Sequence, residues 1–241
     1  MENFEYPIRL NRYLYLKNYC SRRQADVFIT KGQVKINGKA AILGQKVYET
    51  DEVEVGAQIK KQKENFVYYI FHKPKGIVTR NPQGDEKSIE DIWPTAKTKK
   101  LHPIGTLDKA SFGLVLLTND TRIVDRLLSP KYKHEKEYRV RVDKHINGYF
   151  AQKMENGVNI EGYVTKPCKV ETTGDKAFKI ILTEGKKHQI RRMCVALGYQ
   201  VQELKRTRIM NLHLTKQTVK GTGRELTVTE KMELLKTLGV M

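Results

Sequence analysis

Pro103-Ile104-Gly105-Thr106-Leu107-Asp108-Lys109-Ala110-Ser111-Phe112-Gly113-Leu114 places one carboxylate, Asp108, between two glycines and runs on into an apolar stretch at 115–117. A single acid beside a buried segment can be desolvated and held against a substrate. Taken alone, Asp108 is better explained as a turn residue that binds its own backbone, a common role for aspartate next to glycine. Its role therefore depends on the rest of the chain.

The composition of the whole chain predicts a globular protein with a polyanionic partner. Of its 241 residues, 39% are hydrophobic, which is enough to bury one sizeable core or two unequal ones. The chain has 45 Lys and Arg against 27 Asp and Glu, a net charge of +18 that is spread over its length. This excess favours RNA as the partner. A basic protein from a basic proteome is the alternative.

The cysteines and the apolar runs exclude several classes of protein. Cys20, Cys168 and Cys194 stand far apart, so their spacing predicts neither a zinc site nor a disulfide framework. The sequence shows no apolar signal core near its N-terminus and no run that approaches a membrane span. We therefore expect a cytoplasmic protein without a metal or a membrane partner, and we expect a monomer.

The first sixty residues predict a small domain of two helices and a β segment. Apolar residues over 8–16 are spaced for one buried helical face, which leaves Arg9 and Arg12 outside. Ser21-Arg22-Arg23-Gln24 matches a capping box that starts a second helix, and Lys31-Gly32 ends it. Asn37-Gly38, after an alternating segment, is typical of a tight hairpin turn, and strand character returns at 52–55.

Two adjacent arginines, Arg22 and Arg23, stand at the N-terminus of the second predicted helix, where the helix dipole is already positive. A bound phosphate explains them better than a solvated face does. This arrangement resembles the RNA-binding domain that ribosomal protein S-four shares with many RNA-modifying enzymes. We expect that domain over residues 1–60, a linker over about 56–65 and a second domain over 61–241.

The second domain alternates strand and helix patterns. Residues 66–71 predict a buried strand that leaves the core at the turn 72–76. A helical face over 123–128 is ended by Ser129-Pro130, and residues 136–142 alternate so that Tyr138 faces the core. Further strands are predicted at 178–182 and 201–204, and a basic turn at 184–188 leads into a helix that ends near Gly198.

Four motifs in this domain resemble those of the pseudouridine synthases of the RsuA branch. They are Lys-Pro-x-Gly at 73–76, Gly-x-Leu-Asp-x-x-Ser-x-Gly-Leu at 105–114, Lys-x-Tyr at 136–138 and Gln-Ile-Arg-Arg-Met at 189–193. The segments 134–138 and 206–211 are most similar to the RluF-type enzymes that act on large-subunit ribosomal RNA. The resemblance implies an α+β fold, in which helices flank a mixed, largely antiparallel sheet that follows the small S-four-like domain.

The resemblance also implies a reaction and its residues. Uridine would leave its stack and be isomerised to the carbon-linked form, which needs no cofactor. Asp108 would act as nucleophile or base toward the ribose, Arg191 would keep it ionised, and Tyr138 would stack on the uracil and relay a proton. From the residues alone, Tyr138 is equally a core aromatic and Arg191 a phosphate contact. His188 is interpreted as pocket scaffold.

The remaining site residues expected from the resemblance and the basic pattern form two groups. Leu107, Gln189 and Ile190 would line the substrate pocket. The residues expected to bind RNA are Arg9, Arg12, Arg22, Arg23, Lys73, Lys136, Lys187, Arg192, Arg206 and Arg208.

The chain departs from the family pattern at three positions. Thr106 stands where the family usually has arginine, Ala110 where it often has an acid, and Thr121 where it often has glycine. A non-catalytic or weakened RNA-binding factor for ribosome assembly, with the same fold, is therefore an alternative, and so is a synthase that acts on transfer RNA. A DNA-binding regulator is less favoured, because no recognition helix is evident.

Overall fold

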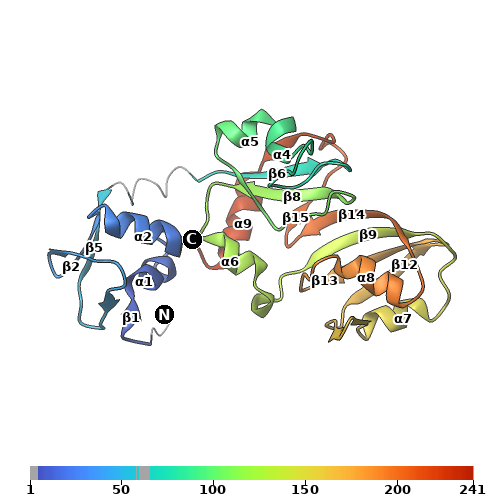
Figure 1. Ribbon diagram of the computed structural model, residues 1–241, viewed down its shortest axis with the longest axis horizontal. Coiled ribbons are helices and arrows are strands. Elements are labelled where there is room, and N and C mark those ends of the chain that lie inside the picture. The colour runs from blue at the N-terminus through green and yellow to red at the C-terminus, as the bar shows by residue number, and fades with distance from the viewer. Residues whose placement is uncertain (1–4, 58, 60–65, 241) are drawn as a thin grey trace. The chain divides into compact units, whose positions relative to one another are not determined.

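The computed structural model of this chain describes residues 5–57, 59 and 66–240 (Figure 1). The described residues form two compact units. The N-terminal unit runs to Val67 and includes residues 120–124 and Val240, and the larger unit consists of residues 68–119 and 125–239. None of the helices in these ranges combines the length and apolar character that a bilayer crossing demands.

The N-terminal unit contains two helices and short strands around its own core. The helices are α1 (Leu10–Leu16) and α2 (Arg22–Thr30). The strands are β1 (Ile8–Arg9), β2 (Val34–Ile36), β3 (Lys39–Ala40), β4 (Lys46–Val47) and β5 (Val53–Val55), which pair as β1-β4 and β3-β2-β5. Ile8 is buried as predicted, but it lies in a strand because its backbone pairs with Val47.

Local signals in this unit are confirmed. The Ser21 hydroxyl accepts a hydrogen bond from the Gln24 N–H, and the Gln24 carboxamide oxygen accepts one from the Ser21 N–H, both at 3.2 Å. Asn37 and Gly38 both have left-handed φ angles, 52° and 77°, in the two-residue β2–β3 hairpin. The linker predicted over 56–65 falls mostly outside the described residues, although Ile59 is buried in this core.

The segment 120–124 also belongs to the N-terminal unit. The Thr121 hydroxyl donates to the Gln24 carboxamide oxygen at 2.9 Å, and the Arg122 guanidinium donates to the Asn18 carbonyl at 2.8 Å. A buried ion pair of 2.7 Å joins Arg122 to Asp120. The threonine that replaces the expected glycine at 121 is thus bonded to Gln24, the N3 residue of the capping box that begins α2.

One mixed sheet organises the larger unit, with the order β12-β13-β9-β14-β8-β6-β16. Its β8–β14 pair is parallel and its other pairs are antiparallel, as expected from the resemblance. Its strands are β6 (Tyr68–Lys73), β7 (His102–Ile104), β8 (Phe112–Thr118), β9 (Lys136–Val142), β12 (Lys169–Gly174), β13 (Ala177–Leu182), β14 (Val201–Ile209), β15 (Leu212–His213) and β16 (Gly223–Glu225). The strands β10 (Asn159–Ile160) and β11 (Tyr163–Val164) form a separate hairpin.

Helices cover this sheet unevenly (Figure 1). They are α4 (Ile89–Ile92), α5 (Pro94–Thr98), α6 (Ile123–Leu128), α7 (Phe150–Glu155), α8 (Gln189–Ala196) and α9 (Val228–Leu238). One face of β9, β13 and β14 packs against α7 and α8, through contacts such as that of Phe150 with Phe178 at 4.9 Å between ring centroids. Trp93, between α4 and α5, packs on Phe71 of β6 at 5.2 Å.

Two strands run further than the sequence predicts. β6 continues through His72 and Lys73, which were expected in a turn, because its pairing with β8 extends to Gly113. β14 continues to Ile209 because it pairs with β9 along nearly its whole length. In both cases basic residues enter the sheet, where a local pattern predicts a solvated loop.

Candidate active site

Asp108 lies in the loop between β7 and β8, and its side chain is 36% exposed. Its carbonyl accepts a hydrogen bond from the Ser111 N–H at 2.9 Å, which closes a turn. Its carboxylate lies 3.4 Å from Nε2 of His188. The carboxylate is therefore open to solvent while the backbone that carries it is fixed.

Three side chains hold this loop by its backbone. The Lys73 ammonium donates to the Ser111 carbonyl at 2.8 Å, and the Arg206 guanidinium donates to the Gly105 carbonyl at 2.9 Å. The Thr79 hydroxyl donates to the Leu107 carbonyl at 2.6 Å and accepts from the Leu107 N–H at 2.9 Å. The loop is thus bonded on both sides of Asp108. Thr79 was not anticipated, since an isolated threonine carries no motif.

The two buried cations shape the electrostatics of the site. Lys73 is fully buried and Arg206 nearly so. Burial lowers the pKa of Lys73 to about 8; the charge of Asp108 opposes this change and that of Arg206 adds to it. The charge of Asp108 thus favours the charged form of the Lys73 ammonium.

Gly113 explains one glycine of the central motif. Its φ is +115°, and a Cβ atom at this position would lie 2.3 Å from the Arg206 carbonyl oxygen and 2.7 Å from the Arg206 nitrogen. These contacts arise where β8 pairs in parallel with β14. Only glycine allows the two backbones to approach this closely, and this approach brings Arg206 to the loop.

Arg191 reaches the same loop from α8. Its guanidinium donates to the Ser111 hydroxyl at 3.2 Å, the Ala110 carbonyl at 3.4 Å and the Val201 carbonyl at 3.2 Å. Within the described ranges it forms no ion pair with Asp108, whose carboxylate faces His188 instead. His188 is half-exposed and begins α8 with a left-handed φ of 53°. Its interpretation as pocket scaffold did not anticipate this position beside the Asp108 carboxylate.

Tyr138 lies on β9, where the register sets it beside Arg206 of β14 and Ile180 of β13. Its side chain is partly buried and packs against the core. It therefore faces the side of the sheet that carries Arg206, as the alternation predicts. This position is compatible both with a core aromatic and with a residue that lines the site.

The three expected pocket residues are buried. The Gln189 side chain donates to Glu184 and accepts from the Lys186 N–H, both at 2.9 Å, so it holds the basic turn before α8 together. These bonds occupy its amide, and its expected place in the substrate pocket stays a prediction. Leu107 and Ile190 remain apolar candidates beside the loop.

The residues expected to bind RNA separate into two groups. Arg9, Arg12, Arg22, Arg23 and Lys187 are exposed. For three of the others burial opposes the expectation, whereas the last two are partly exposed and paired with carboxylates, and their role in RNA binding stays a prediction. Lys73, Lys136 and Arg206 are buried, Arg192 pairs with Glu161, and Arg208 pairs with Glu135 and Glu137. Lys73, predicted in a turn, and Arg206 and Arg208, predicted beyond the last strand, instead lie within β6 and β14.

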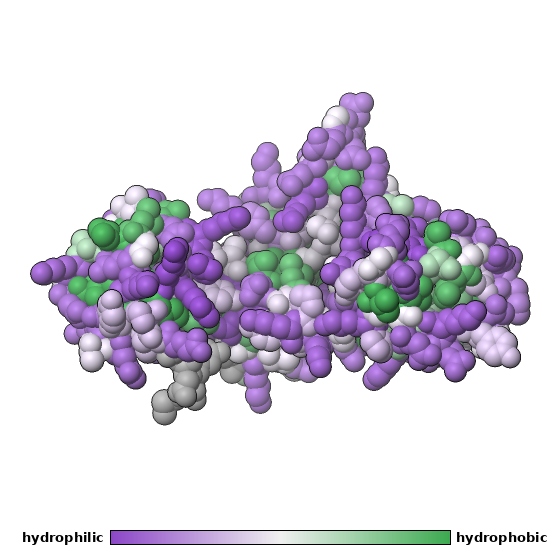
Figure 2. All heavy atoms as spheres, turned by 60° about the horizontal axis from the view of Figure 1, so that its bottom comes forward, coloured by the Kyte–Doolittle hydropathy of each residue, from purple (hydrophilic) through white to green (hydrophobic). Residues whose placement is uncertain are grey.

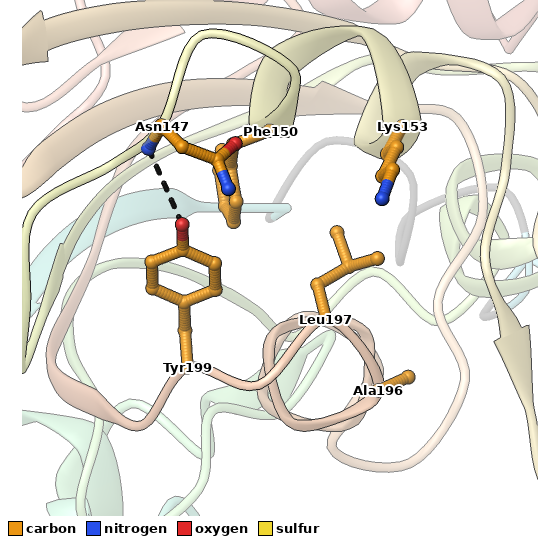
Figure 3. A pocket seen from close by; sticks show the side chains of 6 residues that line it. All are labelled: Asn147, Phe150, Lys153, Ala196, Leu197 and Tyr199. Atoms are coloured by element: carbon orange, nitrogen blue, oxygen red, sulfur yellow. Dashed lines mark hydrogen bonds between the residues drawn. The ribbon is translucent and has the colours of Figure 1, made fainter.

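A pocket of about 170 Å³ lies elsewhere in the larger unit (Figure 3). It is lined by Asn147, Phe150, Lys153, Ala196, Leu197 and Tyr199. The Tyr199 hydroxyl accepts a hydrogen bond from the Asn147 N–H at 3.3 Å. This pocket is at the C-terminal end of α8, and Asp108, Tyr138 and Arg191 do not line it. Among the described residues, no group of three or more His, Cys, Asp or Glu is placed to hold a metal ion.

Hydrophilic side chains dominate the surface shown in Figure 2, with small apolar areas between them.

The cysteines at 20, 168 and 194 are free. Burial raises the pKa of Cys168 to about 11 and that of Cys194 to about 12, so neither thiol is suited to act as a nucleophile.

Comparisons with known proteins agree on one relationship. A family model described as RNA pseudouridylate synthase matches residues 67–196, and an S4 domain model matches residues 8–53. The "Dual-specificity RNA pseudouridine synthase RluF" of Escherichia coli (strain K12) is 42% identical over 231 residues, which cover 95% of this chain and 79% of the relative. The "Ribosomal large subunit pseudouridine synthase B" of Bacillus subtilis (strain 168) is 34% identical over 235 residues, which cover 94% of this chain and 95% of the relative. A solved structure titled "Crystal structure of pseudouridylate synthase" matches with a TM-score of 0.69 at 30% identity, over 94% of this chain and 99% of that one.

Proposed function

We propose that this chain, which belongs to the RNA pseudouridine synthase family, isomerises a uridine of large-subunit ribosomal RNA with Asp108 as its catalytic residue. One observation carries the assignment of Asp108: the loop is bonded through its backbone to Lys73, Thr79 and Arg206, while the carboxylate itself stays accessible. A catalytic group needs this combination of a fixed position and an open approach.

The reaction that we assign to the site is balanced without a co-reactant. The bond between N1 of the uracil and C1′ of the ribose breaks, and a bond between C5 and C1′ forms. The hydrogen on C5 leaves as a proton, and N1 gains one. No electron acceptor, group donor or metal is part of this balance, so a carboxylate and a proton relay suffice.

The side chains around Asp108 support distinct roles in this proposal. The charge of Asp108 favours the charged form of the buried Lys73 ammonium, and Nε2 of His188 lies 3.4 Å from the Asp108 carboxylate. Arg191 fixes the loop at Ser111 and Ala110, and it lies close enough to the loop to contact a phosphate or the carboxylate when RNA binds. Tyr138 provides an aromatic ring on the same side of the sheet as Arg206, where an extruded uracil could stack.

The substrate class rests on the N-terminal unit and on the relatives. The S4 match covers residues 8–53, and Arg22 and Arg23 are exposed in the first turn of α2. Phosphate groups bind well at such a helix N-terminus. Both named relatives are RNA pseudouridine synthases, and the name of one specifies the ribosomal large subunit. We include in the proposal that the protein acts as a monomer in the cytoplasm.

The test is Asp108→Asn, with Asp125→Asn as an exposed carboxylate control. The amide removes the ionised group with almost no change in volume. We expect Asp108→Asn to bind large-subunit ribosomal RNA as tightly as the parent and to form no pseudouridine in single-turnover reactions. Turnover above a small fraction of the parent rate would exclude Asp108 as the catalytic residue.

Mapping pseudouridines in ribosomal RNA from cells that lack the protein gives the target. A site that disappears in large-subunit RNA, and returns when the parent gene is supplied, supports the substrate class. If no ribosomal site changes and a transfer RNA site does, the transfer RNA alternative is correct. If no RNA changes, the chain is a binding factor that retains the fold.

A further inference from the structure

Consecutive residues of β6 and β14 point to opposite faces of the sheet, because side chains alternate along a strand. Lys73 and Arg206 point toward the loop of Asp108, where both bond to its carbonyl oxygens. Their neighbours His72 and Lys205 therefore face the other way. We call the face that His72 and Lys205 occupy the rear face of the sheet. Leu204, which precedes Lys205, lies on the other face, in the core formed with α7 and α8, as this alternation requires.

The register gathers basic residues on this rear face. Lys205 pairs with Arg139 of β9 and with Phe112 of β8. Lys220, in the segment before β16, places its ammonium 5.9 Å from the centroid of the Phe112 ring. We call Phe112, Arg139, Lys205 and Lys220 the rear basic cluster. Arg139 and Lys220 are exposed, and Phe112 and Lys205 are partly buried.

The cluster carries positive charge that the fold does not neutralise. Within the part of the chain that the structure describes, Arg139, Lys205 and Lys220 form no ion pair, whereas Lys179, the next cation along the sheet, is paired with Glu171. Burial, with the charges of Arg139 and Lys220, lowers the pKa of Lys205. Cations held this close repel one another, and a bound polyanion removes that cost.

Two carboxylates lie near this face, and one of them is engaged by other side chains. Glu137 accepts a hydrogen bond from the Thr207 hydroxyl at 2.8 Å and pairs with Arg208 at 3.7 Å. Glu203 lies opposite Arg141 in the β14–β9 register, one pair further along the strand from the cluster. A negative partner approaching Lys205 and Lys220 therefore meets positive charge.

His72 adds a polar group beside the cluster. Its Nδ1–H donates to the Thr218 carbonyl at 3.0 Å, so in the neutral ring Nε2 is an acceptor. This Nε2 is buried and has no hydrogen-bond partner among the described residues. Burial, aided by Lys205 and Lys220, lowers the pKa of His72, so the ring is neutral at pH 7. A hydroxyl group that reached this nitrogen would satisfy it.

We propose that the rear basic cluster is a second RNA-binding surface, which holds a strand of the substrate RNA that flanks the target uridine. Phosphates contact Arg139, Lys205 and Lys220, and one base stacks on Phe112. An aromatic ring among unpaired cations is the combination that binds single-stranded RNA. The surface rests on RNA being the substrate, as proposed above, but it lies on the opposite face of the sheet from Asp108.

The test compares two full-length triple variants that lose the same charge. Arg139→Gln/Lys205→Gln/Lys220→Gln removes the cations of the cluster, and Lys87→Gln/Lys97→Gln/Lys100→Gln removes exposed lysines near α4 and α5. Binding of a large-subunit ribosomal RNA transcript is measured by filter retention over a range of salt concentrations. For three lost phosphate contacts we expect the slope of log affinity against log salt to fall by roughly 2 in the cluster variant, and to change little in the control.

Phe112→Leu separates stacking from charge. We expect it to weaken RNA binding by roughly tenfold, as for the loss of one stacked base, without changing the salt slope. Thermal unfolding verifies that each variant is folded. An equal fall in the salt slope of RNA binding in the cluster and control variants, or an unchanged slope in both, would overturn the proposal. It would also be overturned if the cluster variant kept its affinity for RNA but lost binding to an acidic ribosomal protein.

The outcome is independent of catalysis. The side chains of Arg139, Lys205 and Lys220 form no hydrogen bond or ion pair with the described loop of Asp108, so at saturating RNA we expect the cluster variant to keep the single-turnover rate of the parent. If the parent itself forms no pseudouridine, the proposed reaction fails while the binding result still decides whether the cluster holds RNA. A reduced rate at saturation with unchanged affinity would assign these residues to the chemistry and refute a binding surface.

Discussion

Lys73→Met gives a sharp test of the electrostatics beneath the candidate active site. Lys73 is fully buried, and its pKa falls from 10.5 to about 8 in the folded chain. Since each pKa unit corresponds to about 1.4 kcal/mol, keeping this side chain charged costs about 3 kcal/mol of folding free energy. Against this, the variant leaves the carbonyls of Ser111 and Pro74 without their donor, at about 1–3 kcal/mol for each buried group.

The pH dependence separates these two effects. Below pH 8 the ammonium is charged in both the folded and the unfolded chain, so it contributes no slope. Between pH 8 and 10.5 the folded state releases its proton while the unfolded state keeps it, so stability rises with pH. We expect the parent to gain up to about 3 kcal/mol relative to Lys73→Met across this window. Taking the difference cancels the thiols of Cys168 and Cys194, whose raised pKa values act in the opposite direction.

The assay is urea unfolding at several pH values, followed by fluorescence. Trp93 is the one tryptophan of the sequence, and it packs on Phe71 of β6, so it reports on the larger unit. Lys75→Met, at an exposed neighbouring position, is the control and should show the slope of the parent. Parallel pH profiles for the parent and Lys73→Met would refute the claim that a buried, desolvated ammonium lies beneath the loop.

Three further changes test other parts of the structure. Gly113→Ala should destabilise the larger unit by about 3–5 kcal/mol, because backbone strain and overpacking against Arg206 add. Gly38→Ala, where φ is also positive but the added Cβ meets open space, should cost about 1 kcal/mol. Equal losses of stability in urea unfolding would contradict the close approach of Gly113 to Arg206. Arg22→Gln/Arg23→Gln should lower the salt slope of RNA binding by roughly 1–2, and an unchanged slope would show that the N-terminus of α2 holds no phosphate. Thr106→Arg should speed conversion of a uridine in a duplex more than of one in a loop, because the parent lacks a cationic side chain there to offset the cost of extrusion. Single-turnover rates that match those of Thr229→Arg in both contexts would remove this interpretation.

Local features of the fold were predictable because their physics is local. The capping box at Ser21 and the hairpin at Asn37-Gly38 each depend on residues within a few positions, and both form as expected. The same signal was overlooked before α9, where Thr227 and Glu230 also form a capping box. The order of motifs along the larger domain indicated the family, and the family implied the mixed sheet.

The candidate site was less predictable because its supports are distant in sequence. Lys73 and Arg206 are basic residues that a local pattern assigns to the surface, yet each is buried against backbone carbonyls. The sequence around Lys73 and around Arg206 does not indicate these carbonyl partners. The pairing of His188 with Asp108 spans eighty positions and likewise depends on the assembled fold.

The loop of Asp108 is held through its main chain, so the position of its backbone does not depend on which side chains it carries. Carbonyls of Gly105, Thr106, Leu107, Ala110 and Ser111 all accept bonds from outside the loop. Every residue type provides the same carbonyl. The exposed side chains at 106, 109 and 110 can therefore change, as they have at 106 and 110, without moving the carboxylate. Evolution can alter which RNA the loop accepts while the reacting group stays where it is.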